Sequence, residues 1–269
     1  MHTFIPYIAV AFIYLAVAAD FWRHAKASSN TQTSQNLHSA MIALALVLHG
    51  WLLFNNLFGH GFNLGFYNAL SAIFWLTVLI YWLSDLKHEL HSLQAFVLPP
   101  AALFAVLPAI TSQDHYLSIT EANLFVAHIG LAILAYSLFT FAALHALLMA
   151  IAERSLHNKP TLIHLPSFPP LMVMEKLLFR IISLGFILLT ITLISGMLFS
   201  EQIFGKPMQF NHKTIFSIAS WVIYGSLLFG RYQYGWRGQK AIRWTLTGFA
   251  LLLLAYVGSK FVLEVLLHR

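Results

Sequence analysis

The run AHIGLAILAYSLFTFAALHALLMA, residues 127–150, decides the class of fold. It contains no charged side chain and no proline. A helix needs about 20 predominantly apolar residues to cross the hydrocarbon core of a bilayer. The run is therefore long enough to span a membrane, and its two histidines, His128 and His145, would then lie within the span.

The composition of the whole chain agrees with this interpretation. Of its 269 residues, 59% are hydrophobic and only 9% are charged. A soluble domain carries about 25% charged residues, so most of the surface of this chain is not suited to water. Composition therefore indicates a polytopic membrane protein whose main partner is the lipid bilayer.

Eight apolar runs are long enough to be transmembrane helices. They cover approximately residues 4–22, 39–58, 64–83, 93–110, 122–151, 175–199, 213–230 and 241–263. We interpret the first run as a retained helix and not a cleaved signal, because the residues before it carry no Lys or Arg. The sequence thus predicts an all-α membrane helix bundle with about eight transmembrane helices.

The Lys and Arg residues predict the orientation of the bundle. Eleven of the 15 fall in the connections that follow odd-numbered runs or at the adjoining start of the next run, and four fall on the opposite side. Cytoplasmic connections carry the excess of positive charge. Both termini are therefore expected outside the cytoplasm. The basic residues are spread over short loops, which favours membrane topology and gives no indication of a nucleic-acid partner.

The available ligand chemistry depends on histidine. The chain has no cysteine and 14 histidines. The absence of cysteine excludes thiolate metal sites, iron–sulfur clusters and covalent haem attachment. Most of the histidines lie in connections or at the termini, where solvated or interfacial placement explains them. Three lie within predicted spans, where a polar side chain is costly and usually has a partner.

The depth of these three histidines separates them. At about 1.5 Å per residue, His49 lies roughly 13 Å below the outer boundary and His128 roughly 9 Å below it. His145 lies about 25 Å deeper than His128, and for it we favour a hydrogen bond between helices. His49 and His128 share a level, whereas His212 lies just above it, at the outer start of the seventh run. A helix–helix hydrogen bond is also the alternative for His49 and His128.

A haem-binding site is the hypothesis that this arrangement favours. Haem is a large apolar disc whose iron accepts axial histidines. Its carboxylates need cations near water, and Lys213, beside His212, is such a cation, with Lys206 as a second candidate. Two ligand sets remain open: His49 with His128, or His212 with one of them. For His212 and Lys213 the alternative is an interfacial polar pair at the start of a helix. Aromatic residues on these runs could surround the haem, and the alternative is that they face lipid or lie at the membrane interface. They are Trp51, Phe54, Trp75, Tyr136 and Trp221.

Three segments resemble a known family: residues 127–150, FPPLMVMEKLLFRIISLGFILLTITLISGMLF at 168–199, and residues 212–264 with their GWRG, RWTL and GSK motifs. They are similar to the cytochrome c assembly protein family, related to CcmC, CcsA and HemX, in its short YpjD-like inner-membrane branch. The resemblance runs from about residue 40 to the C terminus. It suggests two parts, residues 1–38 with the first helix and its cytoplasmic connection, and 39–269 as the assembly-type transmembrane domain.

The resemblance implies a haem-binding protein of the bacterial inner membrane, acting in cytochrome c biogenesis or haem trafficking and not as an enzyme. The haem would be b-type and non-covalent, and other cytochrome c maturation proteins would be partners. Haem-delivering members carry a tryptophan-rich outward motif, but the corresponding connection here, residues 198–214, has no tryptophan. This difference argues against a haem platform at the surface and against haem transfer to an apocytochrome, and it is compatible with haem binding inside the bundle. The alternative is a regulatory membrane protein that contacts a soluble partner, for example of tetrapyrrole synthesis, through its cytoplasmic loops. A transporter would show broken spans and internal repeats, which the sequence lacks.

Overall fold

The residues that the structure describes form eight α-helices, and the chain divides into two compact units. The computed structural model describes residues 4–24, 32–59, 62–63, 65–88, 90–110, 116–117, 123–157, 170–204 and 212–258. One unit comprises residues 1–118 and 148–174, and the other comprises residues 119–147 and 175–269. We call them unit 1 and unit 2 and describe each by itself.

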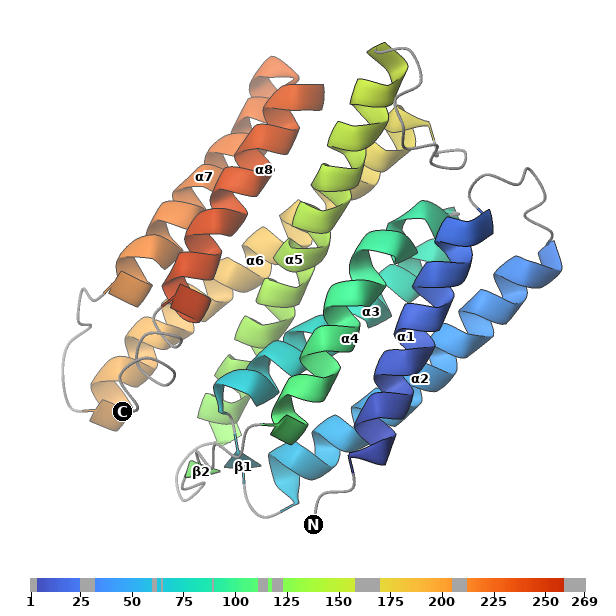
Figure 1. Cartoon of the computed structure of the whole chain (residues 1–269). Helices are drawn as coiled ribbons and strands as arrows, with labels where there is room; N and C mark the ends of the chain where they lie inside the picture. The colour runs from blue at the N-terminus through green and yellow to red at the C-terminus, as the bar shows by residue number, and fades with distance from the viewer. Residues whose placement is uncertain are drawn as a thin grey trace. The chain divides into compact units, whose positions relative to one another are not determined.

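In unit 1, the helices α1 to α4 each pack against two of the other three (Figure 1), and the end of α5 (Asn123–His157) and the first residues of α6 (Leu171–Phe204) also belong to this unit. α1 packs against α2 and α4, and α3 packs against the same two helices. Small residues such as Ala45, Ala69 and Ala101 are fully buried and allow this close approach. The bounds are α1 Ile5–His24, α2 Gln32–Phe58, α3 Phe66–His88, the 3₁₀-helix η1 His91–Leu93, and α4 Gln94–Ile110.

Hydrogen bonds from aromatic side chains fix the helices of unit 1 to one another. Trp75 of α3 donates to the carbonyl oxygen of Leu46 in α2, at 2.8 Å. Tyr7 of α1 donates to Oδ1 of Asn56 in α2, also at 2.8 Å. Such bonds satisfy polar groups that lipid cannot satisfy.

A short strand pair joins the connections that follow α2 and α4. β1 (Phe62–Asn63) pairs antiparallel with β2 (Tyr116–Leu117). Asn63 also holds the start of α3, since its Oδ1 accepts from the backbone of Gly65 and its carbonyl oxygen accepts from Asn68.

Unit 2 is formed by parts of α5 and α6 together with α7 and α8. α7 and α8 run side by side (Figure 1), and Gly248 permits their close contact with Tyr224. Ser220 donates to the carbonyl oxygen of Gly248, at 2.8 Å. Phe139 of α5 stacks on Tyr224 with ring centroids 4.0 Å apart. The bounds are α5 Asn123–His157, α6 Leu171–Phe204, α7 His212–Tyr234, α8 Gly238–Leu253 and a π-turn, η3, Leu254–Gly258.

The predicted fold class, an all-α polytopic membrane bundle, is confirmed. Within the described residues, seven helices are long and apolar enough to cross a membrane. α8 is not among them, because only 16 residues are α-helical before η3, and the residues after 258 are outside the described part. Large apolar side chains such as Phe12 and Val47 are more than two-thirds exposed, as expected for surfaces that face lipid.

Several helices are longer than the apolar runs that predicted them. α2 begins at Gln32 and not at residue 39, and α5 continues to His157 and not to 151. Polar residues at these ends extend each helix beyond the hydrocarbon, where hydropathy no longer marks it. The predicted boundary between residues 38 and 39 stays a prediction, as does a role for the connection at 158–169, which lies outside the described residues.

Candidate functional site

His49 lies at the centre of a buried polar cluster in unit 1. Its side chain is 1% exposed, and Tyr14 and Ser71 are equally buried. Its Nε2 is 2.9 Å from Ser71 Oγ, and its Nδ1 is 3.4 Å from the Tyr14 hydroxyl. Both ring nitrogens thus face hydroxyl groups, and the cluster joins α1, α2 and α3. For His49 to bind a metal, one of these contacts would have to open.

We expect the Ser71→Ala variant to destabilise unit 1 by about 1–3 kcal/mol, because it leaves a buried imidazole nitrogen without its hydroxyl partner. Thermal unfolding of the detergent-solubilised protein measures this. Ser84→Ala, at a partly exposed serine of the same helix, is the control and should change the unfolding temperature little. Equal effects of the two substitutions would show that the His49–Ser71 contact contributes nothing.

His128 contacts a hydroxyl group of unit 2. Its Nδ1 is 2.7 Å from Ser195 Oγ, and the Ser195 hydroxyl lies 3.2 Å from the carbonyl oxygen of Thr192, to which it can donate. When the hydroxyl donates to Thr192, it accepts a hydrogen bond from Nδ1–H of His128. That tautomer of the neutral ring carries its lone pair on Nε2. Metal-binding histidines are usually fixed in this way, with the second nitrogen donating to a neighbouring oxygen.

Gly196 lies beside the Nε2 edge of the His128 ring. A Cβ atom at this position would be 3.4 Å from Cε1 and 4.0 Å from Nε2. His128 also has an aromatic neighbour. The ring of Phe125 is nearly parallel to that of His128, and the two ring centroids are 6.3 Å apart. The donor chemistry of His128 and the small residue next to it fit an axial ligand of a flat apolar cofactor.

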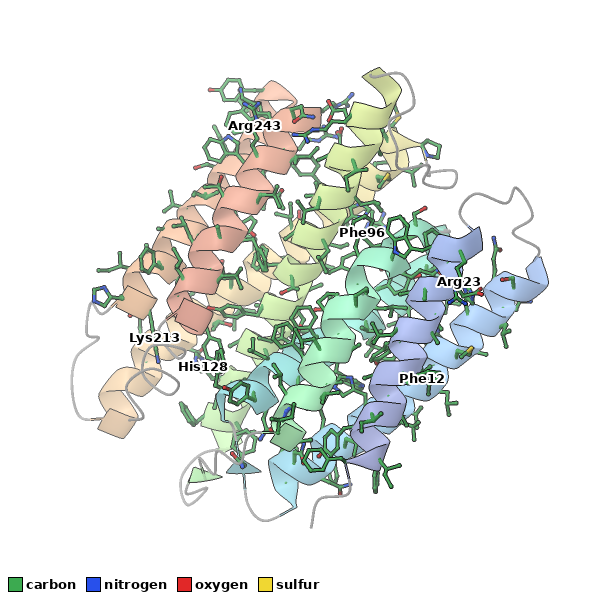
Figure 2. All side chains as sticks on the ribbon, in the orientation of Figure 1. Phe12, Arg23, Phe96, His128, Lys213 and Arg243 are labelled. Atoms are coloured by element: carbon green, nitrogen blue, oxygen red, sulfur yellow. The ribbon has the colours of Figure 1, made fainter. Side chains whose placement is uncertain are left out.

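His212 and Lys213 are the first residues of α7. His212 is exposed and Lys213 is partly buried. Figure 2 shows Lys213 and His128 at the same end of unit 2, with Arg243 at the opposite end. Unit 2 thus has an imidazole inside one end and an imidazole and a cation at the rim of that end. Lys206, the second predicted cation, lies outside the described residues.

Three of the four predicted site residues, His128, His212 and Lys213, lie towards the same end of unit 2, and their common role in one site stays a prediction. His49 belongs to unit 1, so its pairing with His128 stays a prediction. Among the described residues, no group of three or more His, Asp or Glu side chains is arranged to hold a metal ion.

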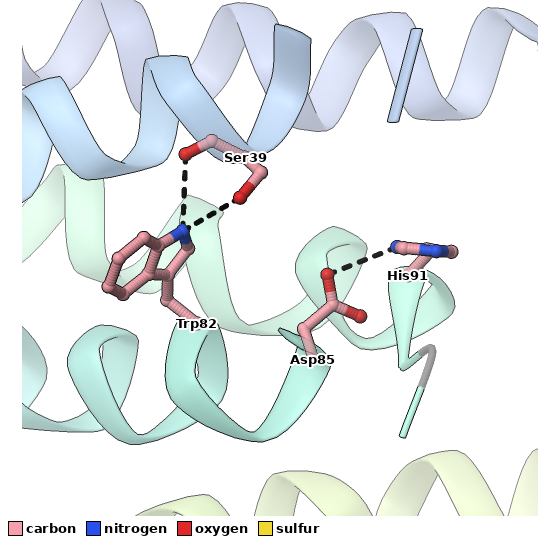
Figure 3. Close-up of polar contacts among 4 residues, drawn as sticks. All are labelled: Ser39, Trp82, Asp85 and His91. Carbon is pink, nitrogen blue, oxygen red and sulfur yellow. Dashed lines mark hydrogen bonds and ion pairs between the residues drawn. The ribbon is translucent and has the colours of Figure 1, made fainter. Parts of the chain in front are cut away.

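Three further histidines, His38, His91 and His145, contact side chains of their own units. His145 is fully buried in unit 2, and its ring is nearly parallel to that of Phe141, with centroids 6.0 Å apart. His91 pairs with Asp85 at 3.0 Å, next to the bond from Trp82 to Ser39 (Figure 3). His38 pairs with Asp20 at 2.9 Å. These last two were predicted as solvated or interfacial residues, and the structure adds a carboxylate partner for each.

The aromatic residues considered for the site divide into two groups. Trp51 and Phe54 are mostly exposed, as in the lipid-facing alternative. The other three form hydrogen bonds within their units. Trp75 bonds to Leu46, Tyr136 donates to the carbonyl oxygen of Leu252, and Trp221 donates to Thr190 Oγ1.

A charged cluster at the other end of unit 2 was missed by sequence reasoning. Glu175 Oε1 is 2.6 Å from Arg231 Nη1 and 3.6 Å from Arg237 Nε. Arg231 also donates to the carbonyl oxygen of Trp236 and lies 4.7 Å from the ring centroid of Phe179. The place of Glu175 shortly after Pro169 and Pro170 predicts a glutamate in the first turn of the helix, where its charge would stabilise the helix dipole. That prediction is wrong, because Glu175 is the fifth residue of α6 and forms ion pairs.

These features define a multi-pass helical membrane protein with buried histidines in its spans. The chain belongs to the Cytochrome C assembly protein family, whose sequence model matches residues 34–267. The predicted resemblance is thereby confirmed. The chain is a multi-pass protein of the bacterial inner membrane.

Similarity to individual proteins supports the YpjD-like branch. The chain is 35% identical over 173 residues to the inner membrane protein YpjD of Escherichia coli K12, covering 64% of this chain and 63% of YpjD. It thus matches somewhat less than two-thirds of that relative's length. It is also 23% identical over 285 residues to a cytochrome c biogenesis protein CcsA of Prochlorococcus marinus, covering 95% of this chain and 89% of CcsA. The family is one of cytochrome c assembly proteins, and CcsA is named as a cytochrome c biogenesis protein.

Proposed function

We propose that the protein binds b-type haem non-covalently through the Nε2 atom of His128 and acts in cytochrome c biogenesis or haem trafficking. The observation that supports this most is the 2.7 Å contact between Ser195 Oγ and His128 Nδ1, which fits the tautomer whose lone pair is on Nε2, the ring edge next to Gly196. The second axial ligand would be His49 or His212. Haem would supply an iron centre that binds these imidazoles, and the role of the chain would be to hold and orient the cofactor.

The cationic rim of unit 2 would hold the haem carboxylates. Lys213 is a cation at the same end as His128 (Figure 2). A hydrogen bond between a lysine and a carboxylate is stronger than a neutral one, and Lys213 is partly buried. With the orientation that the positive charges predict, this end faces away from the cytoplasm, and both termini lie on that side. Haem would then be bound in the outer half of the membrane, and cytochrome c maturation proteins would be partners.

Haem titration of the purified protein tests this proposal. We expect a Soret band that saturates at about one haem per chain, because one His128 site is proposed. His145→Ala is the control, since His145 lies far from His128 along α5 and should not alter binding. A protein that binds no haem at micromolar concentration would refute the proposal.

The hydrogen bond to Ser195 gives a more specific prediction. We expect Ser195→Ala to weaken haem binding about 10- to 100-fold, the usual effect of removing the partner that orients a metal-binding histidine. The matched control is Ser183→Ala in the same helix, where the hydroxyl donates only to the backbone of Phe179. Both variants would be titrated with haem. Equal affinities of the two variants would contradict the orienting role of Ser195.

A further inference from the structure

A groove lies on α7 and α8 of unit 2, at the end opposite His128. Its volume is about 520 Å³. Trp221, Gly225 and Phe229 of α7 line its length, and Tyr234, Trp236 and Trp244 surround its end. The lining is almost entirely apolar or aromatic, and Phe229 and Tyr234 are mostly exposed.

The end of the groove has a fixed shape. The indole ring of Trp236 occupies the space that a Cβ atom on Gly230 would need, so glycine is required there. Trp236 packs against Trp244 with ring centroids 5.0 Å apart and stacks on Tyr234 at 6.4 Å. Gly235, with φ of 64°, makes the turn that returns Trp236 to the helices. Tyr234, Trp236 and Trp244 thus form an aromatic wall, whose position is fixed by the backbone turn at Gly235.

Cations surround this wall. The Lys240 Nζ atom lies 4.4 Å from the ring centroid of Trp236. Arg237 and Arg243 are exposed, and Figure 2 shows Arg243 at this end of unit 2. The nearby carboxylate of Glu175 is already paired with Arg231. The mouth of the groove therefore has a surplus of positive charge.

The length of the groove matches one leaflet of a bilayer. From Trp221 to Gly230, α7 rises about 14 Å, and half of a hydrocarbon core is about 15 Å. The apolar part thus extends from the cationic end to about the middle of the membrane. Tryptophan and tyrosine at its end are typical of the level of the lipid headgroups.

We propose that this groove binds one anionic phospholipid. The acyl chain lies along α7 between Trp221 and Phe229, and the phosphate contacts Lys240 and Arg243. We expect an anionic headgroup because of the positive charge at the mouth of the groove. A zwitterionic headgroup has no net charge and would not neutralise these lysine and arginine side chains. This site is separate from the proposed haem site and does not depend on it.

Quenching of tryptophan fluorescence by brominated lipid tests this inference, because three tryptophans line the groove. The protein is reconstituted in phosphatidylcholine vesicles with a small fraction of brominated phosphatidylglycerol or, for comparison, brominated phosphatidylcholine. We expect phosphatidylglycerol to quench at lower mole fraction. Lys240→Gln and Arg243→Gln should each weaken this preference about fivefold. Ser226→Phe, which fills the groove and keeps the cations, should remove it. Lys87→Gln in α3, an exposed lysine of unit 1, is the control and should have no effect.

Two results would overturn the inference. Equal quenching by the two lipids would show that the groove has no preference for anionic lipid, as expected if a helix of another protein occupies it. A preference that survives in both the Lys240→Gln/Arg243→Gln double variant and Ser226→Phe would show that anionic lipid binds elsewhere. Elution as a single species and an unchanged helical circular dichroism spectrum confirm that each variant is folded.

Discussion

We expect the His128→Ala variant to lose more than about 100-fold in haem affinity, a larger effect than loss of an orienting neighbour. The substitution removes the imidazole that is proposed as the iron ligand and that contacts Ser195 through Nδ1. The measurement is a haem titration followed at the Soret band. Since Ser195 loses its partner as well, thermal unfolding should be recorded in parallel.

The choice of second ligand follows from the same titration. If His49 is the partner, His49→Ala should weaken binding as His128→Ala does, and if His212 is the partner, His212→Ala should do so. Haem affinity that is unchanged in the His128→Ala variant would contradict the proposed site, whichever second ligand is used.

We expect the Arg231→Ala variant to lose about 3 kcal/mol of stability, the lower end of the range for breaking a buried ion pair. The Glu175 side chain is 14% exposed, so it would retain a charge that little water reaches. The substitution also removes the contact with Phe179 and the bond to the carbonyl oxygen of Trp236. The unfolding temperature of the solubilised protein should fall by about 6–12 °C.

Arg237→Ala is the matched control for this prediction. Arg237 is 65% exposed and lies 3.6 Å from Glu175, so its removal should cost less than about 1 kcal/mol. The double variant with Glu175→Gln and Arg231→Ala should be more stable than the sum of the single effects predicts, because no charge remains buried. Additive effects, or equal effects of the two arginine substitutions, would show that the Glu175–Arg231 pair is not stabilising.

The helices could be predicted from sequence because hydropathy is a local property. Each predicted run corresponds to a helix, and only the ends differ, as at Gln32 and His157, where polar residues extend the helix into water. α6 begins at Leu171, directly after Pro170 and four residues before the predicted run, which agrees with the preference of proline for the start of a helix.

The contacts of the candidate site could not be predicted, because they depend on how helices rotate about their axes. Ser195 is 67 residues from His128, and Ser71 is 22 residues from His49. Hydropathy places a histidine at a depth in the membrane but does not say which neighbour it faces. The Ser-Gly pair at 195–196 was a local signal of a close contact, since a small residue follows a hydroxyl group there.

The pairing of Glu175 with Arg231 was missed for a related reason. Near the end of a span, a glutamate is explained equally well by the helix dipole and by a distant arginine, and sequence alone does not distinguish them. In the structure, Glu175 lies in the second turn of α6 and is 2.6 Å from Arg231, so it forms an ion pair and does not lie in the first turn, where the helix dipole acts.

The visible spectrum of the haem-loaded His128→Gly variant, recorded with and without added imidazole, tests the central claim most directly. Removing the side chain should leave space beside Gly196 that imidazole can enter. We predict that the variant alone loses the low-spin spectrum of the unmodified protein and that imidazole restores it. A His128→Gly variant that shows the unmodified spectrum without imidazole would contradict iron ligation by His128.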